Sequence, residues 1–135
     1  ADTGEINTSD KRQKNSIGYD MERYEKFFRL LKPTRYRMNN GRSGRFHVGF
    51  IAQDIEEALE AAGLTSMDFA GFIKSPIHER ELANGEEDES SPITDYGYAL
   101  RYQEFAALNT HMIQKLMQRI DELEKRVAEL EEEPL

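Results

Sequence analysis

A serine and a lysine near the start of the chain are the residues whose types and spacing could do chemistry. Ser9 precedes Lys14 by five positions, in the stretch Ser-Asp-Lys-Arg-Gln-Lys. A serine hydroxyl is a poor nucleophile at neutral pH until a base takes its proton. A lysine becomes such a base when burial or nearby positive charge favours its neutral amine. The pair is therefore a candidate nucleophile and general base for cleaving a peptide bond next to Ser9, and the nearby positive charge comes from Lys11, Arg12 and Arg23.

The spacing of this pair restricts the backbone between its members. In a regular helix Ser9 and Lys14 would lie about 140° apart around the axis, which is a poor fit for contact. We therefore expect a turn, or a junction between extended chain and helix. On spacing alone, Ser9 and Asp10 are simply a helix cap followed by a solvated basic turn, and this alternative stays open.

Acyl transfer also needs hydrogen-bond donors that stabilise the oxyanion. Backbone N–H groups or the side chains of Gln53 or Arg101 are candidates, and the sequence does not choose among them. Asp10 and His47 are candidates for an assisting role in orientation or proton transfer, although a histidine in a strand is more often structural.

The sequence predicts neither a metal nor a cofactor. His78 and His111 have no ligand-like spacing with each other or with carboxylates. The glycines at 41, 44 and 49 are not followed by the Gly-Lys-Ser/Thr of a phosphate loop, so hairpin geometry explains them better. The acidic run 86–89 lacks the alternating ligands of a calcium loop.

The first half of the chain predicts a helix, a hairpin and a second helix. Apolar residues recur at helical spacing over 21–31, and Pro33 ends that helix. Residues 34–38 and 46–51 read as two strands, with a loop of about seven residues between them. Residues 53–62 form the next helix, and Gly63 sits where a helix commonly needs a left-handed residue.

The region 64–102 is less regular. Residues 69–73 suggest a short strand that breaks at Ser75-Pro76. The acidic, turn-rich segment 84–92 is expected to be a mobile loop. Residues 96–102 alternate with period two and predict an extended segment that leads into the last helix.

The C-terminal segment predicts a self-associating helix. Its apolar residues are spaced alternately by three and four positions, as in a coiled coil, and almost every other residue over 117–133 is charged. A core helix is the alternative, but nothing obvious remains to bury this stripe. The oligomerisation residues are Ile113, Leu116, Ile120, Leu123, Val127 and Leu130.

Charges beside the stripe favour a parallel arrangement. In a parallel coil, Arg119 faces Glu124 of the neighbouring chain and Arg126 faces Glu131, whereas an antiparallel coil would juxtapose like charges. The number of strands stays open, because β-branched residues at one core position with leucine at the other lean towards dimers in simple coils.

Composition narrows the class of protein. The chain has 135 residues, no cysteine and no apolar run long enough for a membrane span, and its first residues have neither the basic nor the apolar part of a signal peptide. Its hydrophobic content of 38% is lean for a compact monomer, so burial of apolar surface between subunits would help to stabilise the fold.

Charge is distributed unevenly along the chain. Residues 11–45 hold eleven Lys/Arg against three Asp/Glu, and residues 46–100 hold two Lys/Arg against twelve Asp/Glu. We read this as charge complementarity within the fold or between subunits; no nucleic-acid partner is expected of a chain with net charge −8.

Two motifs together resemble a known family. The opening Ser-Asp-x-Arg-x-Lys-x-x-Ile, at 9–17, and Gly-Phe-Ile-Ala-Gln-Asp, at 49–54, precede the heptads after Thr110. Over 8–130 the chain resembles the C-terminal intramolecular chaperone, or auto-processing, domain of phage tailspikes, tail fibres and endosialidases. A related domain occurs in proteins like myelin regulatory factor.

The resemblance implies an α+β fold in which a small mixed helix/hairpin domain precedes a long C-terminal helix that forms a parallel trimeric coiled coil. Residues 1–8 would end an upstream stalk, 9–110 would be the chaperone and auto-processing domain, and 111–135 the coiled-coil helix. The implied partners are two further copies of the chain and the β-stalk of the same polypeptide. By this resemblance a Ser9–Lys14 dyad cuts the Thr8–Ser9 bond once per chain after trimer assembly.

The same resemblance places the protein in the host cytoplasm during phage assembly, and the released domain would be absent from the mature virion. Two alternatives remain from the sequence. One is a module that trimerises and sets register without cleaving, with Ser9 inert. The other is a nucleic-acid-binding module that uses the basic block 11–45.

Overall fold

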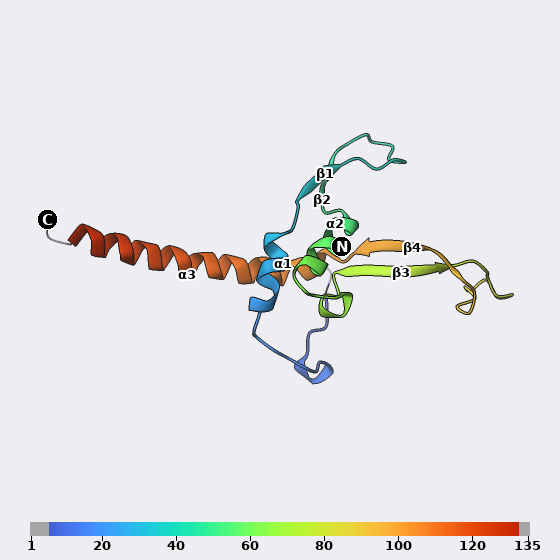
Figure 1. Ribbon diagram of the computed structural model, residues 1–135, viewed down its shortest axis with the longest axis horizontal. Helices are drawn as coiled ribbons and strands as arrows, with labels where there is room; N and C mark the ends of the chain where they lie inside the picture. The colour runs from blue at the N-terminus through green and yellow to red at the C-terminus, as the bar shows by residue number, and fades with distance from the viewer. Residues whose placement is uncertain (1–5, 133–135) are drawn as a thin grey trace.

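The computed structural model describes residues 6–132. A small body carries several projections, as Figure 1 shows: a long helix leaves it on one side and a β-hairpin on the opposite side, while a second hairpin stands out above. The elements, in chain order, are η1 (Lys11–Gln13), η2 (Glu22–Tyr24), α1 (Glu25–Arg29), β1 (Thr34–Tyr36), β2 (His47–Gly49), α2 (Ala52–Ala61), η3 (Ser66–Asp68), β3 (Phe72–His78), β4 (Ile93–Leu100), η4 (Tyr102–Glu104) and α3 (Phe105–Glu132), where η marks a 3₁₀ turn.

The expected mixture of helices and antiparallel hairpins followed by a long C-terminal helix is confirmed. β1 pairs with β2 and β3 with β4, each pair forming its own two-stranded antiparallel sheet. The helix expected over 21–31 is shorter than predicted, because its first turn is the 3₁₀ turn η2 and only Glu25–Arg29 are α-helical.

An aromatic and aliphatic core joins segments that are far apart in sequence. Phe27 of α1 is fully buried, and its ring lies 5.2 Å from that of Phe69. The Phe69 ring packs in turn 5.0 Å from the ring of Phe105, at the start of α3. Burial of this kind is the main stabilising contribution to a small domain. The remaining buried apolar residues are Ile55, Ala58, Leu59, Leu64, Phe72 and Leu108.

The motif Gly-Phe-Ile-Ala-Gln has a packing explanation. The hydroxyl of Tyr102 accepts a hydrogen bond from the N–H of Phe50 at 3.1 Å, and the Phe50 ring stacks 4.9 Å from that of Phe105. A Cβ at position 49 would lie 2.5 Å from the Tyr102 hydroxyl. Gly49 is therefore required for β2 to approach the start of α3.

The predicted end of α2 is confirmed. Gly63 has a φ of +74°, a conformation that costs glycine little and other residues more. Its N–H donates to the carbonyl of Glu60, and the N–H of Leu64 donates to that of Leu59 at 2.9 Å. These bonds satisfy carbonyls that the helix leaves free.

Two sequence predictions about hairpins were wrong. The strand does not break at Ser75-Pro76, because β3 continues to His78 and Pro76 pairs with Tyr96 of β4. A two-stranded sheet has only edge strands, so a residue without an N–H is tolerated. The loop between β1 and β2 spans residues 37–46 rather than about seven residues, because the strands are only three residues long.

The segment 84–92, expected to be a mobile loop, closes the β3–β4 hairpin with defined turns. Gly85 has a φ of +87°, and the N–H of Asp88 donates to the carbonyl of Arg80 at 2.8 Å. The N–H of Leu82 donates to the carbonyl of Glu86 at 2.6 Å. These bonds give the acidic segment a specific path.

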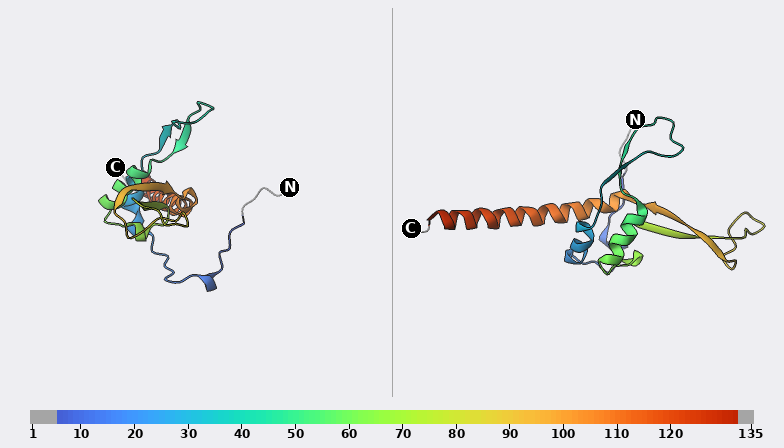
Figure 2. Two further views of the ribbon diagram at one scale, coloured as in Figure 1. Left: turned by 90° about the vertical axis from the view of Figure 1, so that its right-hand side faces the viewer. Right: turned by 45° about the horizontal axis from the view of Figure 1, so that its top comes forward.

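Helix α3 is continuous over 28 residues and begins at Phe105, six residues before the coiled-coil segment expected from the heptads. Its first turns are anchored in the core through Phe105 and Leu108. The rest leaves the body (Figure 2). Within residues 6–132, no helix is both long and apolar enough to cross a membrane.

Candidate functional site

Ser9 and Lys14 lie in direct contact. The Nζ of Lys14 is 2.6 Å from the Oγ of Ser9, a hydrogen-bond distance. The expected turn is present between them: η1 is a single 3₁₀ turn, and Lys14 after it is extended, with φ −122° and ψ 157°. Because the helical part is only one turn long, the side chains of Ser9 and Lys14 can meet, whereas a longer regular helix would hold them apart.

Asp10, one of the predicted assisting residues, holds this turn. Its carboxylate caps η1 by accepting from the backbone N–H of Arg12 at 2.9 Å. The same carboxylate lies 2.7 Å from the Nη2 of Arg12. The hydrogen bonds from the Arg12 side chain, and then from its backbone N–H, hold the pKa of Asp10 below its ordinary value. Because Asp10 provides the cap, the hydroxyl of Ser9 is left to Lys14.

The pair is exposed to solvent. Both side chains lie on the N-terminal segment, which runs away from the body in Figure 2. A lysine acts as a base only as the free amine, and removal from water favours that form. The geometry of a nucleophile and a base is therefore present in a single chain, while a shielded environment is not provided by the described residues.

The other predicted assisting residues lie elsewhere. His47 stacks on Tyr36, with ring centroids 5.6 Å apart. Arg101 donates from Nη1 to the carbonyl of Ala70 at 2.8 Å, and Gln53 lies exposed in the first turn of α2. Within residues 6–132, no hydrogen bond joins His47, Gln53 or Arg101 to Ser9 or Lys14.

The histidines other than His47 have structural partners. His78 Nδ1 lies 2.9 Å from the carbonyl oxygen of Ser91. His111 Nε2 lies 2.9 Å from Glu25 Oε2, and Lys115 donates to the same oxygen at 3.1 Å, which ties α1 to α3. Among the described residues no cluster of His, Asp and Glu could hold a metal ion.

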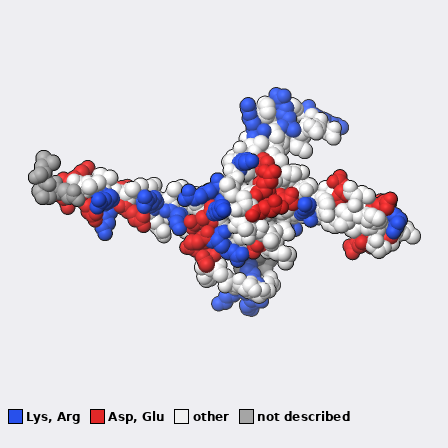
Figure 3. All heavy atoms as spheres, in the orientation of Figure 1, with Lys and Arg blue, Asp and Glu red and all other residues white. Residues whose placement is uncertain are grey.

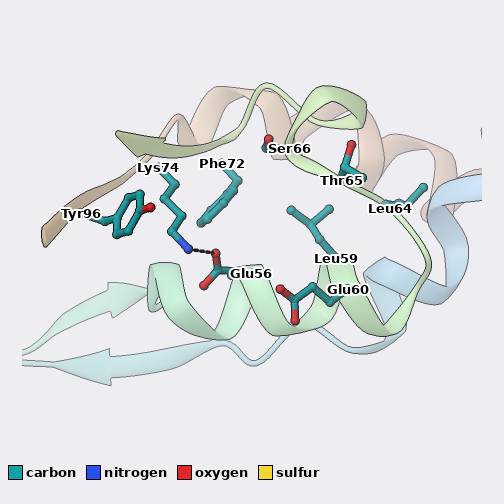
Figure 4. Close-up of a pocket in the computed structure, with 9 residues that line it drawn as sticks. All are labelled: Glu56, Leu59, Glu60, Leu64, Thr65, Ser66, Phe72, Lys74 and Tyr96. Carbon is teal, nitrogen blue, oxygen red and sulfur yellow. Dashed lines mark hydrogen bonds and ion pairs between the residues drawn. The ribbon is translucent and has the colours of Figure 1, made fainter. Parts of the chain in front are cut away.

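A pocket of about 300 Å³ lies between α2 and β3 (Figure 4). Leu59, Leu64 and Phe72 supply apolar walls, and Lys74 reaches across to Glu56 at 2.8 Å. The hydrogen bond that Lys74 donates to Glu56 raises the pKa of Lys74, so less of this lysine is present as the free amine than of an ordinary one. Within the pocket, the Lys74 amine is thus engaged by Glu56.

The oligomerisation stripe is uncovered in the single chain. The exposed fractions of Ile113, Leu116, Ile120, Leu123, Val127 and Leu130 lie between 48% and 58%. A groove of about 620 Å³ between α1 and α3, lined partly by Phe28 and Met112, continues this stripe towards the body. Within the chain, Arg119 lies 3.4 Å from Glu122 and Arg126 lies 3.6 Å from Glu129, both pairs on α3.

Charge is segregated over the surface. Figure 3 shows Lys and Arg along the β1–β2 arm and Asp and Glu over the central body. The cations of the arm are Arg35, Arg37, Arg42 and Arg45, and Arg35 and Arg37 lie over the ring of Phe46 at 5.0 and 4.2 Å from its centroid. The positively charged arm and the negatively charged surface of the body are thus on different parts of one fold.

Arg12 is the residue near the site whose role the sequence analysis missed. The sequence indicates Arg12 only as one of several nearby cations, whereas in the structure it pairs with Asp10 through its side chain and its backbone N–H. The Asp-x-Arg spacing inside the first motif was the signal that could have identified the pair.

The segment that contains both sequence motifs also matches a known protein family. Residues 9–64, which contain both motifs, match a peptidase family described as chaperone of endosialidase. A capsule-specific depolymerase of Klebsiella phage KP32 is 29% identical over 113 residues, which are 80% of this chain and 11% of the depolymerase. The chain thus spans about a tenth of the length of this curated relative.

Two solved structures share the fold. A crystal structure of a novel intramolecular chaperone has a TM-score of 0.60 and 22% identity, covering 82% of this chain and 99% of that one. The carboxy-terminal domain of the bacteriophage T5 L-shaped tail fibre with its intramolecular chaperone domain has a TM-score of 0.53 and 20% identity, covering 95% of this chain and 33% of that one. The match of residues 9–64 to the endosialidase-chaperone family confirms the family resemblance that the sequence motifs indicated.

Proposed function

We propose that this chain is the C-terminal intramolecular chaperone of a phage tail fibre or tailspike, and that it releases itself by cutting the Thr8–Ser9 bond. The observation that carries the proposal is the 2.6 Å contact between Lys14 Nζ and Ser9 Oγ, inside the segment that matches a peptidase family described as chaperone of endosialidase. Asp10 caps an exposed basic turn, as the alternative of a simple cap also expects, and the proposal is preferred because the hydroxyl of Ser9 is engaged by Lys14 and not by the cap.

The chemistry needs only the chain and water. Lys14, as the neutral amine, takes the proton of the Ser9 hydroxyl while Oγ attacks the carbonyl carbon of Thr8. The C–N bond to Ser9 breaks as Lys14 returns the proton to the leaving nitrogen, which leaves an ester between Thr8 and Oγ. Water then hydrolyses that ester, giving a carboxylate on Thr8 and restoring the hydroxyl of Ser9. The chain is its own substrate, so each copy reacts once.

Assembly would switch this site on. The contact between Ser9 and Lys14 exists in a single chain but is exposed to solvent. A second and third copy, or the upstream stalk folded beside them, would remove the amine from water and favour its neutral form. Cleavage would then follow trimerisation and would not precede it.

The trimer would form along α3 in parallel register. The half-exposed stripe and the groove beside Phe28 offer one continuous apolar surface for two neighbouring copies. Aligning three chain ends removes part of the entropic cost of nucleating a non-local trimeric stalk. Release of the aligning domain afterwards would leave the stalk kinetically trapped. These steps belong to the host cytoplasm during virion assembly.

Intact mass spectrometry tests the proposal. A soluble tag ahead of Ala1 is followed over time in the wild type, in Ser9→Ala and in Lys14→Ala, with Lys26→Ala as an exposed-lysine control in α1. We expect a fragment that begins at Ser9 in the wild type and the control, and none in the two dyad variants. Cleavage that persists in Lys14→Ala would refute the dyad, and a trimeric wild type that stays intact would leave only the registration module.

A further inference from the structure

We propose that Asp10 and Arg12 form a positioning pair for self-cleavage, whose task is to hold the turn that brings Lys14 to Ser9. The inference rests on the proposed function, and it assigns a role to the residues between the nucleophile and the base. Neither Asp10 nor Arg12 touches the reacting atoms, so both act through the backbone of η1.

The pair makes a set of interlocking hydrogen bonds. Asp10 Oδ1 accepts from the backbone N–H of Arg12 at 2.9 Å and from its Nε at 3.2 Å. Asp10 Oδ2 accepts from Nε at 3.1 Å and from Nη2 at 2.7 Å. One carboxylate thus binds the backbone and the guanidinium of the same residue, which fixes the side chain of Arg12 against the start of the turn.

Two backbone hydrogen bonds also hold the turn closed. The N–H of Gln13 donates to the carbonyl of Asp10 at 3.0 Å, and that of Lys14 donates to the carbonyl of Lys11 at 3.1 Å. Five residues of extended chain span roughly 16 Å, and the turn removes much of that separation. With the turn closed, Lys14 Nζ lies 2.6 Å from Ser9 Oγ.

Because the Asp10–Arg12 pair is exposed, its effect on the cleavage rate can be told apart from an effect on the stability of the fold. The side chain of Arg12 is 84% exposed, and exposed ion pairs contribute little to the free energy of unfolding. Reaction rate depends far more steeply on placement, because an error of about 1 Å between reacting groups can slow a reaction by roughly 100-fold. The pair is therefore expected to affect cleavage and leave folding unchanged.

Arginine is specifically suited to this position. Its planar guanidinium presents two donors to two carboxylate oxygens, whereas a lysine ammonium is a point charge without that geometry. Asparagine at position 10 would keep an acceptor for the backbone N–H of Arg12 and lose the charged pair. These differences predict a graded series of variants.

The test is the self-cleavage rate of the full tagged chain under conditions where it is trimeric. We expect Arg12→Ala and Asp10→Ala to slow cleavage by about 2–5-fold, the change in the population of the closed turn that an exposed ion pair can produce, with Arg12→Lys and Asp10→Asn falling between them and the wild type. Gln13→Ala, in the same turn but outside the pair, is the control and should cleave at the wild-type rate. Thermal unfolding should be the same in all of these variants.

A double variant distinguishes a coupled pair from two independent effects. If Asp10 and Arg12 act as one unit, the Asp10→Ala, Arg12→Ala double variant cleaves no more slowly than the slower single variant. Arg12→Lys keeps the positive charge near Lys14 and loses the planar guanidinium, so in that variant the rate should fall while the midpoint of its pH dependence stays at the wild-type value. Rates equal to wild type in both single variants, or multiplicative losses in the double, would overturn the proposal.

Failure of the proposed function would be seen separately, because a wild type that never cleaves refutes self-processing whatever the variants do. In that case NMR cross-relaxation between the Cβ protons of Ser9 and the Cε protons of Lys14 becomes the readout. Its loss in Arg12→Ala but not in Gln13→Ala would support the positioning pair, and its persistence in Arg12→Ala would overturn it.

Discussion

Truncation of Leu123 to alanine tests the proposed assembly surface. Leu123 lies in the middle of the apolar stripe of α3 and is 48% exposed in the single chain. Alanine favours helix as strongly as leucine does, so the substitution removes apolar contact area without disfavouring the helix. We expect the variant to fold as the wild type does and to associate more weakly.

The expected magnitude follows from the exposed fraction. Complete burial of a leucine is worth about 1.5–3 kcal/mol, so covering the exposed half contributes roughly 0.7–1.5 kcal/mol in each chain and about 2–4.5 kcal/mol in a trimer. Loss of that energy lowers the association constant by a factor of about 30–2,000. Because trimerisation depends on the cube of the monomer concentration, the midpoint concentration should rise by the square root of that factor, about 5–45-fold.

Sedimentation equilibrium over a range of concentrations measures both the number of chains and the midpoint. Lys125→Ala, on the charged part of the same helix, is the matched control, and far-ultraviolet circular dichroism checks that the helix is retained. A wild type that stays monomeric throughout, or a Leu123→Ala midpoint no higher than that of Lys125→Ala, would refute the argument. A wild type that saturates as a dimer would retain the stripe as the interface and refute the trimer.

Three further predictions concern the body that carries the site. Phe27→Ala empties a position that is 0% exposed, so chemical denaturation should show a loss of about 3–5 kcal/mol in unfolding free energy; Tyr19→Ala, at a position 93% exposed, should show none. Gly49→Ala puts a Cβ 2.5 Å from the Tyr102 hydroxyl, and we expect a loss of about 1 kcal/mol, the scale of one hydrogen bond; Gly18→Ala, with nothing within 4 Å of its Cβ, is the control, and equal stabilities would contradict the packing explanation. Hydrogen bonds from His111 and then Lys115 hold the pKa of Glu25 below its ordinary value. The stabilisation by Glu25 is therefore present above the pKa of the unfolded chain and is lost as pH falls through the folded value; the Tm difference between wild type and Glu25→Gln should shrink on acidification, and a difference independent of pH would exclude this ion-pair explanation.

Elements governed by local rules were predictable from the sequence. The end of α2 depends on the left-handed conformation of Gly63, and the stripe on α3 depends on helical periodicity, so both follow from a few neighbouring residues. The strand through Pro76 was missed for a physical reason. Whether proline interrupts a strand depends on whether a neighbour needs its N–H, and that is settled by the number of strands in the sheet.

In the candidate site, too, local features were predictable from the sequence and the features set by long-range packing were not. The types and spacing of Ser9 and Lys14 indicated a nucleophile and a base, and the turn that joins them is local enough to expect from five residues. The positions of Arg101 and His47 were not predictable, because long-range packing sends Arg101 to the carbonyl of Ala70 and stacks His47 on Tyr36.

The sequence by itself therefore determined the chemistry that is available, the helix that is left with an apolar stripe, and the family that the chain resembles. Only the tertiary structure decided that Tyr102 requires a glycine at position 49 and that Ser9 and Lys14 lie in solvent. The physical reason is that residue type and local spacing set what a group can do. Burial and neighbours distant in sequence set the surroundings in which it does so.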